Sequence, residues 1–116
     1  DSLGHDAGDL VLSELSRIIN EQVRQTDIFG RWGGEEFILI CSQISEERLI
    51  TLADKLRETI EQHNFIIDGE SIKVTVSIGA TKVKATETFD AVFKRTDKAL
   101  YNAKNSGRNQ VRFARP

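Results

Sequence analysis

The chain of 116 residues contains no methionine, one cysteine and one proline. Because the single cysteine, Cys41, has no partner in the chain, it can form neither an intrachain disulfide nor a zinc site built on several cysteines. Cys41 lies in an apolar stretch, so we expect it to be a small buried hydrophobic side chain. The absence of methionine and the first residue, Asp1, lead us to expect an excised or processed piece of a longer product.

The chain also lacks an excess of charge of one sign and a long hydrophobic run. Its 16 basic and 18 acidic residues leave a formal charge of -2, which argues against bulk binding to a nucleic acid polymer or to an anionic membrane. No apolar run approaches the roughly 20 residues that a membrane-spanning helix needs, and no signal-peptide pattern is present. The only proline is the terminal Pro116 and no flexible linker interrupts the sequence, so we predict a single domain over residues 1–116.

Apolar residues recur at spacings of three and four in three segments, which predicts helices over residues 8–23, 45–63 and 88–105. Strands are predicted within residues 28–42, 72–81 and 110–114. The second half of 28–42 is apolar at consecutive positions, as expected for a strand covered on both faces. Ser45 is suited to begin the second helix and Gly107 to follow the third. This order predicts an α/β sandwich, with a mixed sheet flanked by helices.

Two glycines and two carboxylates lie where one apolar strand turns into the next, at Gly33, Gly34, Glu35 and Glu36. This position predicts the tip of a hairpin. Glycine lets the backbone approach a ligand closely, and carboxylates are hard oxygen ligands for Mg²⁺. The combination suits metal-assisted binding of a nucleoside triphosphate. The alternative is a glycine turn followed by two solvated acids.

Asp9 lies near the start of the first predicted helix, where the helix dipole alone favours an acid. A carboxylate there could also accept hydrogen bonds from the ring N–H and the amino group of guanine, a pair of donors that adenine does not offer. The sequence leaves both interpretations of Asp9 open.

Two further charged groups lie at helix ends, and each has a structural and a functional interpretation. Arg24 and Asp27 follow the first helix and form either a solvated ion pair or a site for a phosphate and a guanine edge. Lys104 and Arg108 end the third helix, where cations complement the helix dipole and could also hold phosphates.

Together these segments resemble the GGDEF domain, the catalytic module of diguanylate cyclases. The signature matches in its Gly-Gly-Glu-Glu-Phe form, as Arg31-Trp32-Gly33-Gly34-Glu35-Glu36-Phe37. The segments 1–9, 76–80 and 97–109 are similar to three other family motifs, among them an ending with Ala99-Leu100-Tyr101, Lys104 and Gly107-Arg108-Asn109. The resemblance covers essentially the whole chain in the family's order.

This resemblance implies a domain that joins two GTP molecules into cyclic di-GMP and releases two pyrophosphates. It implies Mg²⁺ or Mn²⁺ as cofactor, and a homodimer in which two domains face each other. The domain is expected in the cytoplasm, without membrane contact of its own, in a parent that can be membrane-anchored. The family's site residues match the catalytic and metal-binding pair Glu35 and Glu36, and the substrate-binding residues His5, Asp9, Gly33, Gly34, Lys104 and Arg108. An acid at Asp9 favours GTP over ATP.

Arg24 and Asp27 stand at the family spacing for a product-inhibition site, so the resemblance implies feedback inhibition by cyclic di-GMP. The runner-up interpretation is a receptor module that binds cyclic di-GMP without making it. Intact Glu35 and Glu36 favour the enzyme, because a receptor has no need of both. A third interpretation, an inert structural domain, requires every motif match to be coincidence.

The family pattern begins with a strand that precedes Asp1 and is absent here. That strand supplies a metal-binding Asp, a phosphate-binding Lys and a guanine-binding Asn, and it is central in the family fold, which resembles the palm of nucleotide cyclases and polymerases. We therefore expect unpaired neighbouring strands, exposed apolar surface and impaired catalysis in residues 1–116 alone.

Overall fold

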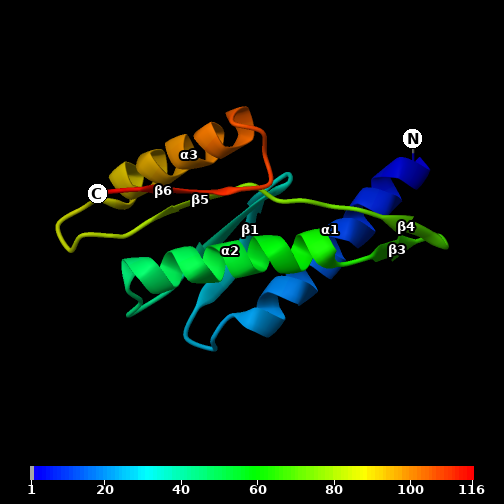
Figure 1. Ribbon diagram of the computed structural model, residues 1–116, viewed down its shortest axis with the longest axis horizontal. Helices are drawn as coiled ribbons and strands as arrows, with labels where there is room; N and C mark the ends of the chain where they lie inside the picture. The colour runs from blue at the N-terminus through cyan, green and yellow to red at the C-terminus, as the bar shows by residue number, and fades with distance from the viewer. Residues whose placement is uncertain (1) are drawn as a thin grey trace. The chain divides into compact units, whose positions relative to one another are not determined.

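The computed structural model describes residues 2–116, and side chains from Ala7 onward. It has a mixed α/β fold, as expected, in which helices alternate with short strands (Figure 1). The elements are α1 (Ser2–Gln22), β1 (Ile28–Gly33), β2 (Glu36–Ile40), α2 (Glu46–Gln62), β3 (Phe65–Ile67), β4 (Glu70–Ile72), β5 (Ile78–Thr81), α3 (Phe89–Asn105) and β6 (Val111–Ala114).

The chain divides into two compact units. The first comprises Asp1–Gln43 with Gln62–Val74, and the second comprises Ile44–Glu61 with Thr75–Pro116. The first unit contains α1, which packs on β3. The second unit contains nearly all of α2 together with α3, which packs on β5 and β6.

The core of the first unit lies between α1 and β3, which contact each other. From α1 it takes Leu15, Ile18 and Ile19, and from β3 it takes Phe65 and Ile67, all buried. The three-and-four spacing of the helical residues places them on one face, which explains why this amphipathic segment folds as a helix against the strand. The helix begins at Ser2 and not near Gly8 as predicted, so Asp9 does not lie in its first turn.

The hairpin of β1 and β2 also belongs to the first unit (Figure 1). Its strands are antiparallel, with Ile28 opposite Ile40, and the rings of Phe29 and Phe37 stack at 5.3 Å between centroids. The prediction that the second strand is covered on both faces is wrong, because no residue of β2 is buried and Ile40 is 50% exposed. Cys41, which follows this strand and was predicted to be buried, is only half-buried.

In the second unit, α3 packs on the parallel pair β5 and β6 (Figure 1). The helix approaches the strand closely at Gly79, where an added Cβ would lie 2.5 Å from the backbone nitrogen of Leu100 and from the carbonyl oxygen of Thr96. Only glycine lets the helix backbone approach the strand so closely. Thr88 caps the start of α3 by accepting a hydrogen bond from the backbone N–H of Ala91.

Within residues 2–116, hydrogen-bonded strands form three two-stranded sheets, β1–β2, β3–β4 and β5–β6, and not the one mixed sheet that was predicted. Likewise, the strand predicted over residues 72–81 is seen only at its two ends, in β4 and β5. A β-ladder needs a partner on at least one side, and in the described part of the chain no strand pairs with residues 73–77. Alternating apolar residues therefore do not suffice to form one continuous strand.

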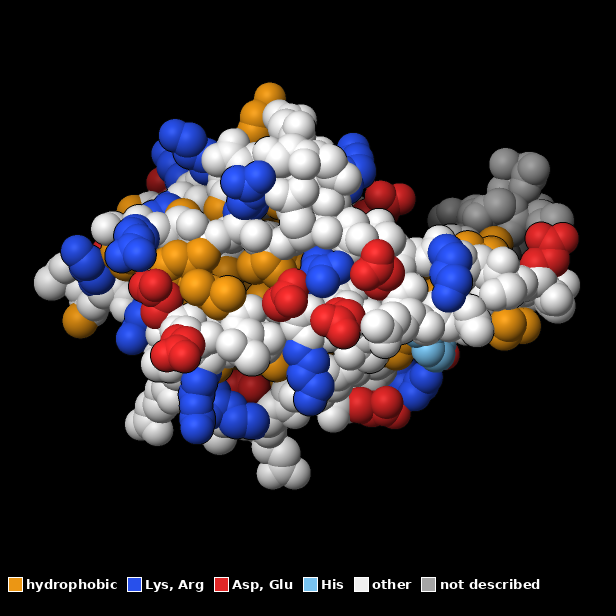
Figure 2. Space-filling view, viewed as in Figure 1, with side chains coloured by type: hydrophobic (Ala, Val, Ile, Leu, Met, Phe, Trp, Pro, Cys, Tyr) orange, Lys and Arg blue, Asp and Glu red, His pale blue; other side chains and the backbone are white. Residues whose placement is uncertain are grey.

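The second unit also has an open cleft of about 570 Å³ between α2 and the start of β6. On the face that Figure 2 shows, apolar side chains are open to solvent between the charged side chains of α2 and the β5–β6 pair. Ile50 and Val111 line this region of the second unit, and neither is fully buried.

Candidate functional site

The glycine and carboxylate segment forms the tip of the β1–β2 hairpin, as predicted. Gly33 pairs with Glu36, which leaves Gly34 and Glu35 as a two-residue loop. Gly34 has a φ of 54°, and a two-residue hairpin loop requires positive φ at its first position, which glycine adopts without strain. The side chain of Arg31 fixes the tip, because its Nε donates to the carbonyl oxygen of Gly34 at 2.8 Å.

Both carboxylates of the tip are exposed. Among the described side chains, Glu35 and Glu36 have no hydrogen-bond or ion-pair partner. The described residues contain no group of three or more histidines, cysteines or acids that could hold a metal ion. Mg²⁺, however, usually keeps several waters and takes one or two carboxylates together with substrate phosphates. Two free, adjacent carboxylates fit that mode of binding.

The space around the two glycines is open. A Cβ added at Gly33 or at Gly34 would meet no atom within 4 Å. Packing therefore does not require glycine at Gly33, whose φ is also not positive. The bare backbone at the tip leaves room for a ligand to lie against the turn.

Asp9 and His5 are the other site residues predicted in the first unit. Asp9 is an exposed residue of α1. Since α1 begins at Ser2, the dipole of the first turn does not explain an acid at Asp9, because that effect falls off within the first turn. The side chain of His5 lies outside the described residues.

Arg24 and Asp27 form a close ion pair between α1 and β1, with 3.0 Å between Nη2 and Oδ1. The pair is not symmetric, because the Asp27 side chain is 1% exposed and that of Arg24 is 49% exposed. Asp27 also accepts from the backbone N–H of Arg24 at 2.8 Å, while Nη2 of Arg24 also donates to the carbonyl oxygen of Ser42 at 2.6 Å. The pair is thus not a solvated one on the aspartate side.

These contacts set the charges at the pair. The hydrogen bond from the Arg24 side chain lowers the pKa of Asp27 below its ordinary value, so the carboxylate stays ionised. Burial raises the pKa of the neighbouring Cys41 thiol, and the negative charge of Asp27 adds to that rise. Nη2 of Arg24 is thus bonded to both Asp27 and the Ser42 carbonyl oxygen, while the Arg24 side chain remains half-exposed.

Lys104 and Arg108 lie at the end of α3, in the second unit. Both are exposed, and within the described residues neither side chain has a hydrogen-bond or ion-pair partner. The backbone N–H of Arg108 donates to the carbonyl oxygen of Ala103 at 3.0 Å across Gly107, which is the bond that ends a helix at a left-handed glycine. Two free cations are therefore held one turn apart at a fixed helix end.

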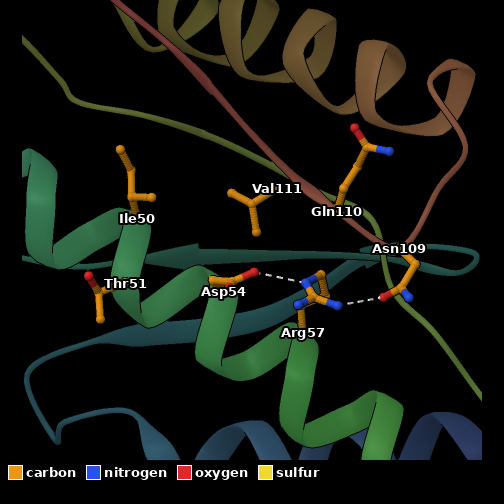
Figure 3. Close-up of a pocket in the computed structure, with 7 residues that line it drawn as sticks. All are labelled: Ile50, Thr51, Asp54, Arg57, Asn109, Gln110 and Val111. Carbon is orange, nitrogen blue, oxygen red and sulfur yellow. Dashed lines mark hydrogen bonds and ion pairs between the residues drawn. The ribbon is translucent and has the colours of Figure 1, made fainter.

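The sequence interpretation assigned no role to a polar cluster in the second unit, which we call the Asn109 cluster: Asp54, Arg57, Glu61 and Asn109. Figure 3 shows Asp54, Arg57 and Asn109 of this cluster. Its helical members are three and four residues apart and look like ordinary surface pairs of a helix. Asn109 joins them across 52 residues of sequence, and no local pattern predicts such a contact.

Among the residues with described positions, no helix is both long and apolar enough to cross a bilayer.

Comparison with known families agrees with the resemblance found in the sequence. A family model described as "Diguanylate cyclase, GGDEF domain" matches residues 1–110. The match runs through both compact units and includes the hairpin tip, Asp9, the Arg24–Asp27 pair and the end of α3.

Curated relatives of the chain are named as diguanylate cyclases. Diguanylate cyclase A of Treponema denticola is 38% identical over 116 residues, which is 99% of this chain and 31% of that protein. Diguanylate cyclase DgcM of Escherichia coli K12 is 40% identical over 111 residues, 96% of this chain and 26% of that protein. The chain thus spans a third or less of these two relatives.

Solved structures share the fold. The diguanylate cyclase SiaD of Pseudomonas aeruginosa, in complex with its activator SiaC, superposes with a TM-score of 0.91 at 37% identity, over 98% of this chain and 44% of that one. The GGDEF domain of DgcB from Caulobacter crescentus, in complex with c-di-GMP, superposes with a TM-score of 0.90 at 29% identity, over 97% of this chain and 68% of that one. The chain therefore belongs to the GGDEF family of diguanylate cyclase domains.

Proposed function

We propose that the protein containing this domain is an active diguanylate cyclase, which condenses two GTP molecules into cyclic di-GMP and two pyrophosphates. The observation that supports this most directly is the hairpin tip, where Glu35 and Glu36 are exposed, have no partner among the described side chains and adjoin open glycine backbone. A domain that only binds cyclic di-GMP has no use for two free carboxylates in that position. The family match over residues 1–110 supports treating both compact units as one catalytic domain.

Each step of the reaction makes one phosphodiester bond. The ribose 3′-hydroxyl of one GTP attacks the α-phosphate of the other, the bond to the β-phosphate breaks, and pyrophosphate leaves. Glu35 accepts the proton of the attacking hydroxyl, and Glu36 helps to hold the metal and the ribose. Glu35 and Glu36 would hold Mg²⁺ or Mn²⁺ together with the substrate phosphates, and the ion would supply positive charge against the leaving group.

The remaining site residues bind and orient GTP. Gly33 and Gly34 let the phosphates lie against the turn, and Lys104 with Arg108 pairs with their negative charge. Asp9 accepts from the ring N–H and amino group of guanine, with His5 in the same substrate-contacting segment. Two domains face each other as a homodimer, because each holds one of the two GTP molecules.

We also propose product inhibition at Arg24 and Asp27. The half-exposed side chain of Arg24 is the member that can contact cyclic di-GMP, since the Asp27 side chain is 1% exposed. Asp27 then acts mainly by holding Arg24 in place. This assignment differs from the sequence interpretation, in which Asp27 itself reads a guanine edge.

Residues 1–116 by themselves should be catalytically impaired. Among the described side chains, the hairpin offers two carboxylates for a metal ion and no group of three or more ligands is present. The three two-stranded sheets of the described chain also leave strand edges unpaired. Turnover by residues 1–116 alone that equals turnover by the full-length parent would contradict this expectation.

The direct test is to incubate the purified full-length parent with GTP and Mg²⁺ and to identify products by mass spectrometry. We expect cyclic di-GMP and two pyrophosphates per product, no product from ATP, and loss of synthesis when the divalent cation is chelated. A folded parent that binds cyclic di-GMP but forms none from GTP would instead support the receptor interpretation.

A further inference from the structure

The turn after α3 has an unusual backbone. Three consecutive residues have positive φ, at 113° for Gly107, 62° for Arg108 and 47° for Asn109. Glycine adopts this region freely, but arginine does not. Such a conformation persists only where the surrounding structure imposes it.

The surrounding structure holds this turn through hydrogen bonds to Asn109. Its Oδ1 accepts from Nη1 of Arg57 at 3.0 Å, and its Nδ2 donates to Oε2 of Glu61 at 2.6 Å. Its backbone N–H donates to the hydroxyl oxygen of Ser77 at 3.2 Å. Both ends of the amide and the main chain are thus fixed from α2 and from the segment before β5, as Figure 3 shows for Arg57 and Asn109.

Arg57 is itself held from three sides. Besides Asn109, its Nε donates to Asp54 at 2.9 Å and its Nη1 to Glu61 at 3.2 Å. Its side chain is only 16% exposed, so it is not a mobile surface arginine. Its carboxylate partners raise its pKa further, so it remains a cation.

Arg108 contrasts with this cluster. The turn that contains it is also tied by Gln110, whose Nε2 donates to the carbonyl oxygens of Ser106 and Arg108 at 2.8 and 3.1 Å. Every one of these bonds fixes the backbone around Arg108, while its own side chain is exposed and, within the described residues, unpartnered. A turn with a purely structural role would favour glycine at a φ of 62°.

We propose that Arg57, Glu61 and Asn109 are positioning residues, which fix the backbone of residues 107–109 so that the Arg108 guanidinium is presented to the triphosphate of GTP. This inference rests on the proposed function and adds to it the residues that determine where the phosphate-binding cation lies. Arg108 is proposed to bind GTP and not to take part in the chemical step. Loss of the cluster should therefore raise the KM for GTP more than it changes kcat.

The test compares steady-state kinetics of the full-length parent and its variants. Asn109→Gly removes the amide without adding backbone strain, and Arg57→Gln removes the cation that holds it. Arg57→Lys is the conservative variant, and Arg48→Gln, an exposed arginine on the same helix, is the matched control. Melting temperatures establish that each variant is folded. If Asn109→Gly does not fold, the KM of Arg57→Lys for GTP provides the test.

We expect Asn109→Gly and Arg57→Gln to raise KM for GTP roughly tenfold, with a smaller change in kcat. Arg57→Lys should recover part of that loss, and Arg48→Gln should match the wild type. In an Arg108→Ala background, Asn109→Gly should raise KM no further, because both changes remove the same interaction.

Two results would overturn the inference while leaving the proposed function intact: an unchanged KM in folded Asn109→Gly and Arg57→Gln, or a further rise of KM in the Arg108→Ala background. A wild-type parent that forms no cyclic di-GMP would instead overturn the proposed function. The two failures are therefore distinguishable.

Discussion

At the scale of single residues, the account depends on which charged side chains are already satisfied. Glu35, Glu36, Lys104 and Arg108 are exposed and lack a described partner. Arg24 and Asp27, in contrast, satisfy each other, and only the arginine reaches solvent. Free charges are suited to bind substrate, whereas a buried carboxylate serves to hold its neighbour.

This asymmetry predicts how the inhibition site responds to mutation. Arg24→Ala should weaken inhibition by cyclic di-GMP at least roughly tenfold, because it removes the charged donor that contacts the ligand. Asp27→Asn should have a smaller effect in the same direction. Initial rates measured across a range of added cyclic di-GMP give both values, and Arg17→Ala, an exposed arginine of α1, is the control. Unaltered inhibition in folded Arg24→Ala would refute the site.

A second residue pair predicts a pH dependence. Hydrogen bonds from the Arg95 side chain lower the pKa of Glu87 from 4.5 to about 2, and Nη2 of Arg95 lies 2.9 Å from Oε1 of Glu87. A carboxyl whose pKa is lowered on folding stabilises the folded state above its unfolded pKa, and this contribution is lost as pH falls from 4.5 toward 2.

The Glu87→Gln variant should therefore show a shallower loss of stability between pH 4.5 and 2 than the wild type. Urea unfolding at a series of pH values gives the measurement. Identical slopes in variant and wild type over that window would contradict the ion pair's role.

At the scale of elements, the helices follow from local sequence and the sheets do not. The helix limits of α2 and α3 agree with the predicted ones because amphipathic spacing and the caps at Ser45 and Thr88 are local features. The predicted strand over residues 72–81 failed in its middle, because a strand exists only with a partner and the pattern does not reveal whether one is there.

The close packing of α3 on β5 predicts that adding one methyl group at Gly79 lowers the stability of the fold. Gly79→Ala would place a Cβ 2.5 Å from backbone atoms of α3, and backbone cannot move aside cheaply, so we expect a loss of about 1–3 kcal/mol in the free energy of unfolding. Denaturant unfolding measures it.

Gly30→Ala is the matched control for this prediction. An added Cβ at Gly30 meets no atom within 4 Å, and Gly30 has no positive φ, so its unfolding free energy should change by less than about 0.5 kcal/mol. Equal effects at the two glycines would show that close packing at Gly79 is not the cause.

At the scale of the whole molecule, the candidate site residues come from segments far apart in the sequence, and both compact units contribute some of them. The hairpin tip and the end of α3 were predicted from local motifs and are present in the structure, whereas the burial of the Asp27 side chain in the Arg24–Asp27 pair was not predicted. The Asn109 cluster was not predicted, because its bonds join residues 48 and 52 positions apart and no spacing rule reports such contacts.

The central claim is that Glu35 serves synthesis and that Arg24 serves inhibition. Its most direct test measures the rate of cyclic di-GMP formation and the affinity for cyclic di-GMP in the same full-length variant, Glu35→Gln. The matched control is Glu70→Gln, since Glu70 is an exposed acid that also follows a hairpin glycine of positive φ, Gly69. Both variants remove one surface charge at a turn.

The account predicts that Glu35→Gln lowers the rate of product formation at least about a hundredfold, with unchanged affinity for cyclic di-GMP, and that Glu70→Gln alters neither. Product formation by folded Glu35→Gln at the rate of the wild type would contradict the account.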